Sequence, residues 1–69
     1  MNRETIVSSN LVSVGYDKTS STLEIEFKNG IYQYSGVSEN EYEGLMNASS
    51  AGKYFNMNIK NRYPCTQVG

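Results

Sequence analysis

The chain has 69 residues, a length that accommodates one small domain. Hydrophobic residues make up 38% of it and charged residues 19%, a balance that is too apolar for a disordered chain. The formal net charge is -1, so the chain lacks the basic excess that is typical of nonspecific nucleic-acid binders, although a local basic patch is compatible with this balance.

The sequence has one cysteine, Cys65, and no histidine. One thiol cannot form an internal disulfide, and a secreted domain of this size usually needs disulfides, so we expect a cytoplasmic protein. The N-terminal residues contain no apolar run of the kind found in signal peptides, and no segment approaches the roughly 20 apolar residues of a membrane span. We expect no membrane association and no metal site, because metal sites need clustered ligands such as Cys and His.

Two strands are predicted in the first half of the chain, after a polar segment over 1–9 that is expected to be flexible. The first strand covers 11–16, where side chains alternate between two faces. The second covers 22–28 and has a strict period of two, which gives it one dry face and one solvated face. The dry face carries Leu23, Ile25 and Phe27, and the solvated face carries Glu24, Glu26 and Lys28.

An Asn-Gly pair at 29–30 predicts a hairpin into a third strand over 31–36, since a type I′ turn needs positive φ at both central residues. Directly opposite residues share a face of a sheet, so this turn would place Tyr32 and Tyr34 in the core or at its edge, with Gln33 on the open face. An RNA-binding sheet of the ribonucleoprotein kind would instead carry its aromatic residues on the open face. The expected pairs are Lys28–Ile31, Phe27–Tyr32, Glu26–Gln33, Ile25–Tyr34 and Glu24–Ser35.

Two short helices are predicted in the second half of the chain. Ser38 and Glu41 form a capping box, which predicts that the first helix begins at Ser38. The segment 49–52 (SSAG) separates it from a second helix that extends to about residue 61, and 64–69 is expected to be a C-terminal tail. The apolar sides are Tyr42, Leu45 and Ala48 or Ser49 in the first helix, and Ala51, Phe55 and Ile59 in the second.

The predicted element order is therefore β-β-β-α-α. We expect an α+β fold in which a three-stranded antiparallel meander is followed by two short helices packed on one face.

Catalysis is not expected, because a sequence without histidine lacks the usual base for a Ser or Cys nucleophile. Cys65 has no orienting partner nearby in the sequence. Gly52 and Lys53 resemble part of a phosphate-binding loop, but the first glycine and the Ser or Thr after the lysine are missing. We expect a non-enzymatic protein without a cofactor; an enzyme would require a pocket that holds perturbed polar groups.

The most basic segment is 52–63 (GKYFNMNIKNRY), which contains three of the six basic residues and no acidic residue. On a helix, Lys53, Asn56 and Lys60 would share the side that faces away from the core. Cations, amides and a ring would suit RNA or another phosphate-bearing partner, but an ordinary solvated helix face has the same composition. The candidate nucleic-acid-binding residues are Lys53, Tyr54, Asn56, Lys60, Arg62 and Tyr63.

Several segments together resemble the KTSC domain, a family named for its occurrence at the C-terminus of some lysyl-tRNA synthetases and also found as small stand-alone bacterial and phage proteins. They are VGYD at 14–17, TLEIEF at 22–27, YQY at 32–34, Val37, and SSAGKYFNMNIKNRY at 49–63. The residues that match the family's pattern are Tyr32 and Tyr34, then Gly52, Tyr54 and Phe55, then Ile59, Lys60 and Tyr63.

The resemblance covers about residues 10–63, which we take as the domain. It implies no established activity, but the family's attachment to a synthetase implies a role in RNA binding. We therefore expect a small binding module whose partner is RNA; the alternative is a protein-interaction module that acts on a host or replication protein. The sequence does not predict the oligomeric state.

Overall fold

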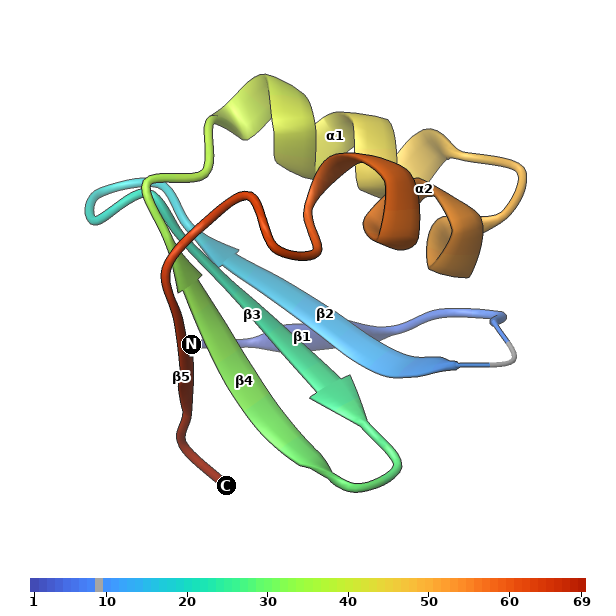
Figure 1. The fold of residues 1–69 in the computed structure, drawn as a ribbon, viewed down its shortest axis with the longest axis horizontal. Helices are drawn as coiled ribbons and strands as arrows, with labels where there is room; N and C mark the ends of the chain where they lie inside the picture. Colours follow the sequence, from blue (N-terminus) through green and yellow to red (C-terminus); the bar gives the residue numbers. More distant parts are fainter. Residues whose placement is uncertain (9) are drawn as a thin grey trace.

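The computed structural model describes residues 1–8 and 10–69 and has two layers, a twisted antiparallel sheet and a pair of helices that cover one of its faces (Figure 1). The strands lie in the order in which they occur in the chain, β1-β2-β3-β4-β5. The elements are β1 (Arg3–Thr5), β2 (Leu11–Asp17), β3 (Thr22–Phe27), β4 (Gly30–Ser35), α1 (Glu39–Asn47), α2 (Ala51–Asn58) and β5 (Cys65–Gln67).

The α+β class and the two helices on one face are confirmed, but the expected three-stranded sheet is wrong because the sheet has five strands. The additional strands come from 1–9 and 64–69, the segments expected to be a flexible segment and a tail. Both are edge strands whose residues are all exposed, so neither has an alternating apolar pattern that the sequence could reveal. Residue 9 lies outside the described residues.

The register of the β3–β4 hairpin differs from the expected one by two residues. Phe27 pairs with Gly30, and the turn consists of Lys28 and Asn29, so all five pairs expected from the Asn-Gly turn are wrong. The positive φ of the turn, 153°, falls at Gly30, where a residue with a side chain would be strained. The observed pairs are Thr22–Ser35, Leu23–Tyr34, Glu24–Gln33, Ile25–Tyr32, Glu26–Ile31 and Phe27–Gly30.

A shift of two residues leaves every side chain on the same face, because the side-chain period of a strand is two. The prediction that Tyr32 and Tyr34 belong to the core or its edge is therefore confirmed. Tyr34 is 6% exposed, and Tyr32 is half-buried against the core. The buried apolar residues are Leu11, Val14, Leu23, Ile25, Tyr34, Val37, Leu45, Phe55 and Ile59.

Serine side chains begin both helices. Ser38 Oγ accepts the backbone N–H of Glu41, as the capping box predicts, and Ser50 Oγ accepts that of Lys53. Helix α2 ends at Asn58, before the expected residue 61, and the chain then turns through Asn61, whose φ is 65°. Asparagine tolerates this left-handed conformation better than most residues, which explains the stop.

Glu41 of α1 joins the two helices. Its carboxylate accepts hydrogen bonds from the hydroxyls of Tyr54 in α2 and Tyr63 beyond it, the latter at 3.1 Å. These bonds to a carboxylate help to raise the pKa of both tyrosines: the bond is the main cause for Tyr54, and burial is the main cause for Tyr63. Gly44 leaves space for the Tyr54 hydroxyl, which would lie 2.3 Å from a Cβ at this position.

The face of the sheet opposite the helices carries a polar network rather than a fully solvated row. Glu24 is only 7% exposed, so the expectation that its side chain is solvated is wrong. Gln33 Nε2 donates to its carboxylate at 2.8 Å, and the Arg3 guanidinium forms an ion pair with it. The bond from Gln33, followed by those from Arg3, lowers the pKa of Glu24 below its ordinary value, against the opposing effect of burial.

Gly15 makes the ion pair between Arg3 and Glu24 possible. It lies between them in the sheet, directly opposite Arg3 on β1 and Glu24 on β3. A Cβ at Gly15 would lie 2.6 Å from the carbonyl oxygen of Asn2 and 3.0 Å from the Arg3 side chain. The absence of a side chain therefore lets β1 and its arginine lie close to the sheet.

Glu24→Gln should lower the free energy of unfolding by about 1–2 kcal/mol at neutral pH, since it removes a charge that two partly buried hydrogen bonds favour. The pKa of Glu24 is lower in the folded protein than its ordinary value of 4.5. The charged carboxylate therefore stabilises the fold fully above about pH 4.5, and this contribution is lost as the pH falls through the pKa of the folded state. Urea denaturation should show the difference between variant and wild type shrinking below pH 4.5. Glu43→Gln, at an exposed position of α1, is the control, and a difference that is independent of pH would contradict this account.

Tyr54→Phe should destabilise the protein by at most about 1 kcal/mol, since it removes one partly exposed hydrogen bond to Glu41. A double-mutant cycle with Glu41→Gln, measured by urea denaturation, tests the contact directly. We expect Glu41→Gln to cost less in the Tyr54→Phe background than in the wild type. Strictly additive effects would mean that the bond contributes nothing to stability.

Candidate functional site

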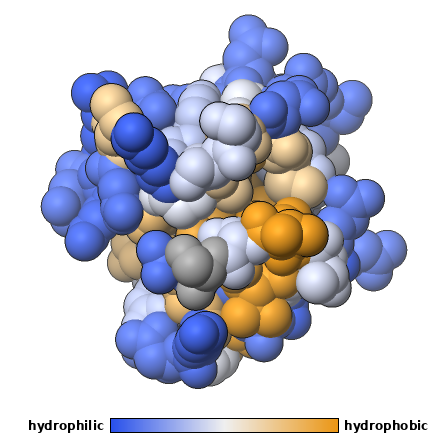
Figure 2. Space-filling view, turned by 90° about the vertical axis from the view of Figure 1, so that its right-hand side faces the viewer, coloured by the Kyte–Doolittle hydropathy of each residue, from blue (hydrophilic) through white to orange (hydrophobic). Residues whose placement is uncertain are grey.

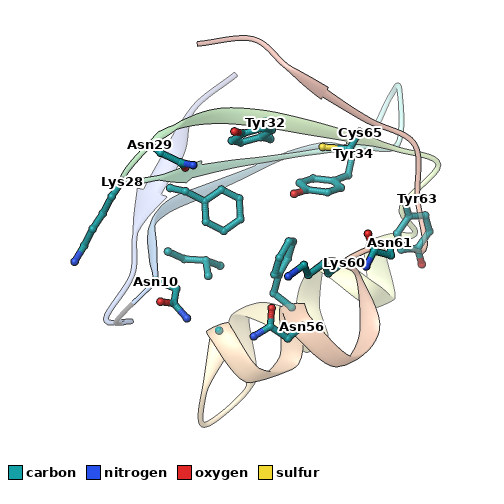
Figure 3. Close-up of a pocket in the computed structure, with 14 residues that line it drawn as sticks. Asn10, Lys28, Asn29, Tyr32, Tyr34, Asn56, Lys60, Asn61, Tyr63 and Cys65 are labelled. Atoms are coloured by element: carbon teal, nitrogen blue, oxygen red, sulfur yellow. The ribbon is translucent and has the colours of Figure 1, made fainter.

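A groove of about 700 Å³ lies between the β3–β4 hairpin and α2 (Figure 3). The sheet supplies one wall through β3, β4 and the start of β2, and the other wall comes from α2 and the turn after it. Figure 2 shows the side of the molecule where β2 begins, with apolar surface gathered between hydrophilic regions. The groove is therefore an open gap in the packing of one layer against the other.

Four aromatic rings in edge-to-face contact form the apolar wall of the groove. The ring centroids are 5.7 Å apart between Tyr32 and Phe27, 5.2 Å between Phe27 and Phe55, and 5.6 Å between Phe55 and Tyr34. Phe55 and Tyr34 are each 6% exposed, whereas Phe27 and Tyr32 are half-buried. The half-buried pair therefore offers ring surface to a ligand, and the buried pair holds the two layers together.

The rim of the groove is polar and basic. Among the described residues that line it, none is acidic, although the chain has seven acidic residues. In Figure 3 Lys60 extends from the end of α2 into the space between helix and sheet, whereas Lys28 extends outward at the hairpin. The polar rim residues are Asn10, Asn29, Asn56, Asn61, Lys28 and Lys60, all of them exposed.

The hydroxyl of Tyr34 remains protonated at neutral pH. Burial raises its pKa well above the ordinary value, and the neighbouring Cys65 and Tyr32 add to the effect. Burial also raises the pKa of Tyr42. These shifts, like the lowered pKa of Glu24, move away from neutrality, whereas a general acid or base needs a pKa close to the working pH.

The structure divides the six candidate nucleic-acid-binding residues into two groups. Asn56, Lys60 and Tyr63 line the groove, and Lys53 and Arg62 are exposed outside its lining. Tyr54 does not line the groove, and its hydroxyl is bonded to Glu41. Lys60 lies beyond the last residue of α2, so the expected stripe of Lys53, Asn56 and Lys60 along one helix is not formed as such.

Sequence reasoning missed the part of the groove that comes from the sheet. Asn10 precedes β2, Lys28 and Asn29 form the hairpin turn, and Cys65 reaches the groove because β5 pairs it with Tyr34. The residues expected to be structural also have a place here: Tyr32, Tyr34, Gly52 and Phe55 line the groove, and Ile59 is fully buried. A helical pattern alone could not reveal a site shared between two layers.

Neither α1 nor α2 has the length and apolar character that crossing a lipid bilayer requires. Within residues 1–8 and 10–69, no three His, Cys, Asp or Glu side chains come together in a way that could hold a metal ion.

Comparison with known proteins identifies the family. The model of the KTSC domain matches residues 7–63. A protein of Stutzerimonas stutzeri (strain A1501) that carries the name uncharacterized protein is 39% identical over 61 residues, which cover 87% of this chain and 86% of the relative. The crystal structure of a KTSC domain protein from Yersinia pestis superposes with a TM-score of 0.96 at 39% identity, covering 99% of this chain and 97% of that one. The chain belongs to the KTSC domain family.

Proposed function

We propose that this KTSC domain is a non-enzymatic module that binds single-stranded RNA through the groove and the adjoining surface of α2. The observation that carries the proposal is the composition of the groove. Rings, amides and lysines meet there without a carboxylate, in a chain whose net charge is -1. This combination suits a ligand that presents flat bases and negative phosphates.

The basic residues near the groove extend the favourable surface beyond it. Lys60 lies in the groove, while Lys53 and Arg62 are exposed on the same segment. Their charges would neutralise successive phosphates of a bound strand and release its counterions. The small number of such charges favours modest affinity and a salt dependence that is set by the few phosphates contacted, with a slope of about 0.7 in magnitude for each.

A binding role is favoured over a catalytic one by the ionisable groups in the groove and in the parts of the fold around it. The pKa of Tyr34 lies far above neutral pH, and the lowered pKa of Glu24 belongs to a carboxylate on the opposite face of the sheet. Glu41, which lies near α2, accepts two tyrosine hydroxyls and serves to join the helices. The pKa shifts of Tyr34 and Glu24 lead away from neutrality, which does not suit proton transfer at neutral pH.

Lys60→Gln should reduce the affinity for a fluorescently labelled single-stranded RNA octamer. It should also make the plot of log K against log salt concentration less steep, by about 0.7 in slope, because one phosphate contact on a single strand contributes that amount. Fluorescence anisotropy over a series of salt concentrations measures both quantities. The matched control is Lys18→Gln, an exposed lysine that lies 3.8 Å from Glu39, outside the groove.

The control should leave the salt slope unchanged. Equal effects of both substitutions would refute the proposed surface, and no binding of RNA by the wild type at low salt would refute the RNA function itself. In that second case, capture of a protein from a lysate that persists after nuclease treatment and at high salt would identify the domain as a protein-interaction module.

A further inference from the structure

We infer that the groove holds one unstacked nucleotide, with the base against the ring of Tyr32 and the phosphate at Lys60. The inference rests on the proposed function, because it assigns to the groove the part of a bound strand that the rings and amides recognise. Beyond RNA binding, the inference specifies that the groove takes a single nucleotide, that Tyr32 stacks on its base, and that unpaired bases are preferred.

Tyr32 is the ring best placed to stack on a base. It stands at one end of the chain of four rings, in contact with Phe27, whereas Phe27 and Phe55 each contact a ring on either side. Tyr34 stands at the other end but is 6% exposed, while Tyr32 is half-buried. An aromatic ring that is firmly packed on one side and open on the other loses little freedom when a base stacks on it.

The polar groups of the opposite wall complement a nucleotide. In Figure 3 the sheet-borne Tyr32 lies across the groove from Asn56 and Lys60. An asparagine amide carries both donors and acceptors, so it can bond to the edge of any base. The ammonium group of Lys60 supplies the charge for a phosphate, and no carboxylate among the described lining residues opposes it.

Gly52 lies in the wall formed by α2, at one end of the groove. A Cβ at this position would lie 3.3 Å from Nδ2 of Asn10, so the glycine leaves room for the Asn10 amide to lie close to the helix. The space of about 700 Å³ is of the size that holds one small ligand. A base in a duplex is already stacked on its neighbours, so a base that stacks on Tyr32 must first be unpaired and turned out, which favours single strands.

Tyr32→Leu tests the inference, because it keeps an apolar side chain on β4 and removes the ring. We expect its affinity for the single-stranded octamer to fall about tenfold, with the salt slope unchanged, since stacking is lost and the phosphate contacts remain. Tyr32→Phe should bind like the wild type. The matched control is Tyr16→Leu, on the same face of the sheet but stacked on Tyr42 outside the groove, which should leave the affinity unchanged. The folding of each variant is checked by thermal unfolding.

Two further arms use the wild-type protein. Uridine 5′-monophosphate should displace the octamer, and an RNA duplex of the same sequence should bind more weakly than the single strand. If the monophosphate binds more tightly than the octamer, the groove has the inferred chemistry, but its ligand is a free nucleotide and not a nucleotide within an RNA strand. These arms decide the question even if Tyr32→Leu does not fold.

The failure of this inference differs from the failure of the proposed function. If the wild type binds the octamer and Lys60→Gln weakens it, but Tyr32→Leu binds normally or the monophosphate does not compete, the domain binds RNA without a base in the groove. If the wild type binds neither the octamer nor the monophosphate, both proposals fall together.

Discussion

The contact of Phe55 with Phe27 and Tyr34 is the interaction on which the rest of the structure depends. It is the point at which α2 meets the sheet, with ring centroids 5.2 and 5.6 Å apart. A domain of 69 residues has a small hydrophobic core and a low stability. Replacing a buried phenylalanine by alanine lowers the free energy of unfolding by about 3–5 kcal/mol. Because Phe55 packs, among the described aromatic rings, on Phe27 and Tyr34 alone, the remaining ring of β4, Tyr32, is left half-buried beside the groove. The groove is thus a consequence of how the layers are joined.

Two carboxylates complete the frame around this contact, one on each side of the sheet. Glu41 holds α2 and the segment after it against α1 through the hydroxyls of Tyr54 and Tyr63, and Glu24 holds β1 against the middle of the sheet through Arg3. Both are acidic groups that a search for catalytic pairs would consider. Their partners show that they stabilise the structure, and neither carboxylate is among the residues that line the groove.

The sequence predicts best what depends on local pattern. The alternation over 22–28 and the serine cap at Ser38 correspond to β3 and the start of α1, because burial periodicity and capping act within a few residues. The segments β1 and β5 could not be predicted, since exposed edge strands are held by backbone pairing and carry no apolar alternation. The Asn-Gly pair predicted the correct face for the side chains of β4, but it predicted a β3–β4 register that is wrong by two residues, because only Gly30 in the turn has a positive φ. Of the candidate site, only the part carried by 56–63 could be anticipated, since the other wall comes from residues distant in sequence.

We propose that the two tyrosines of β4 have two roles, stabilising the core and lining a groove that binds a ligand. The most direct measurement is a backbone amide NMR titration of the whole chain with the single-stranded octamer. We predict that the largest shifts occur at Tyr32, Asn56 and Lys60, around the groove, and that Glu24 and Gln33 on the opposite face of the sheet stay unchanged. Shifts concentrated on Glu24 and Gln33, with the groove unaffected, would contradict the account.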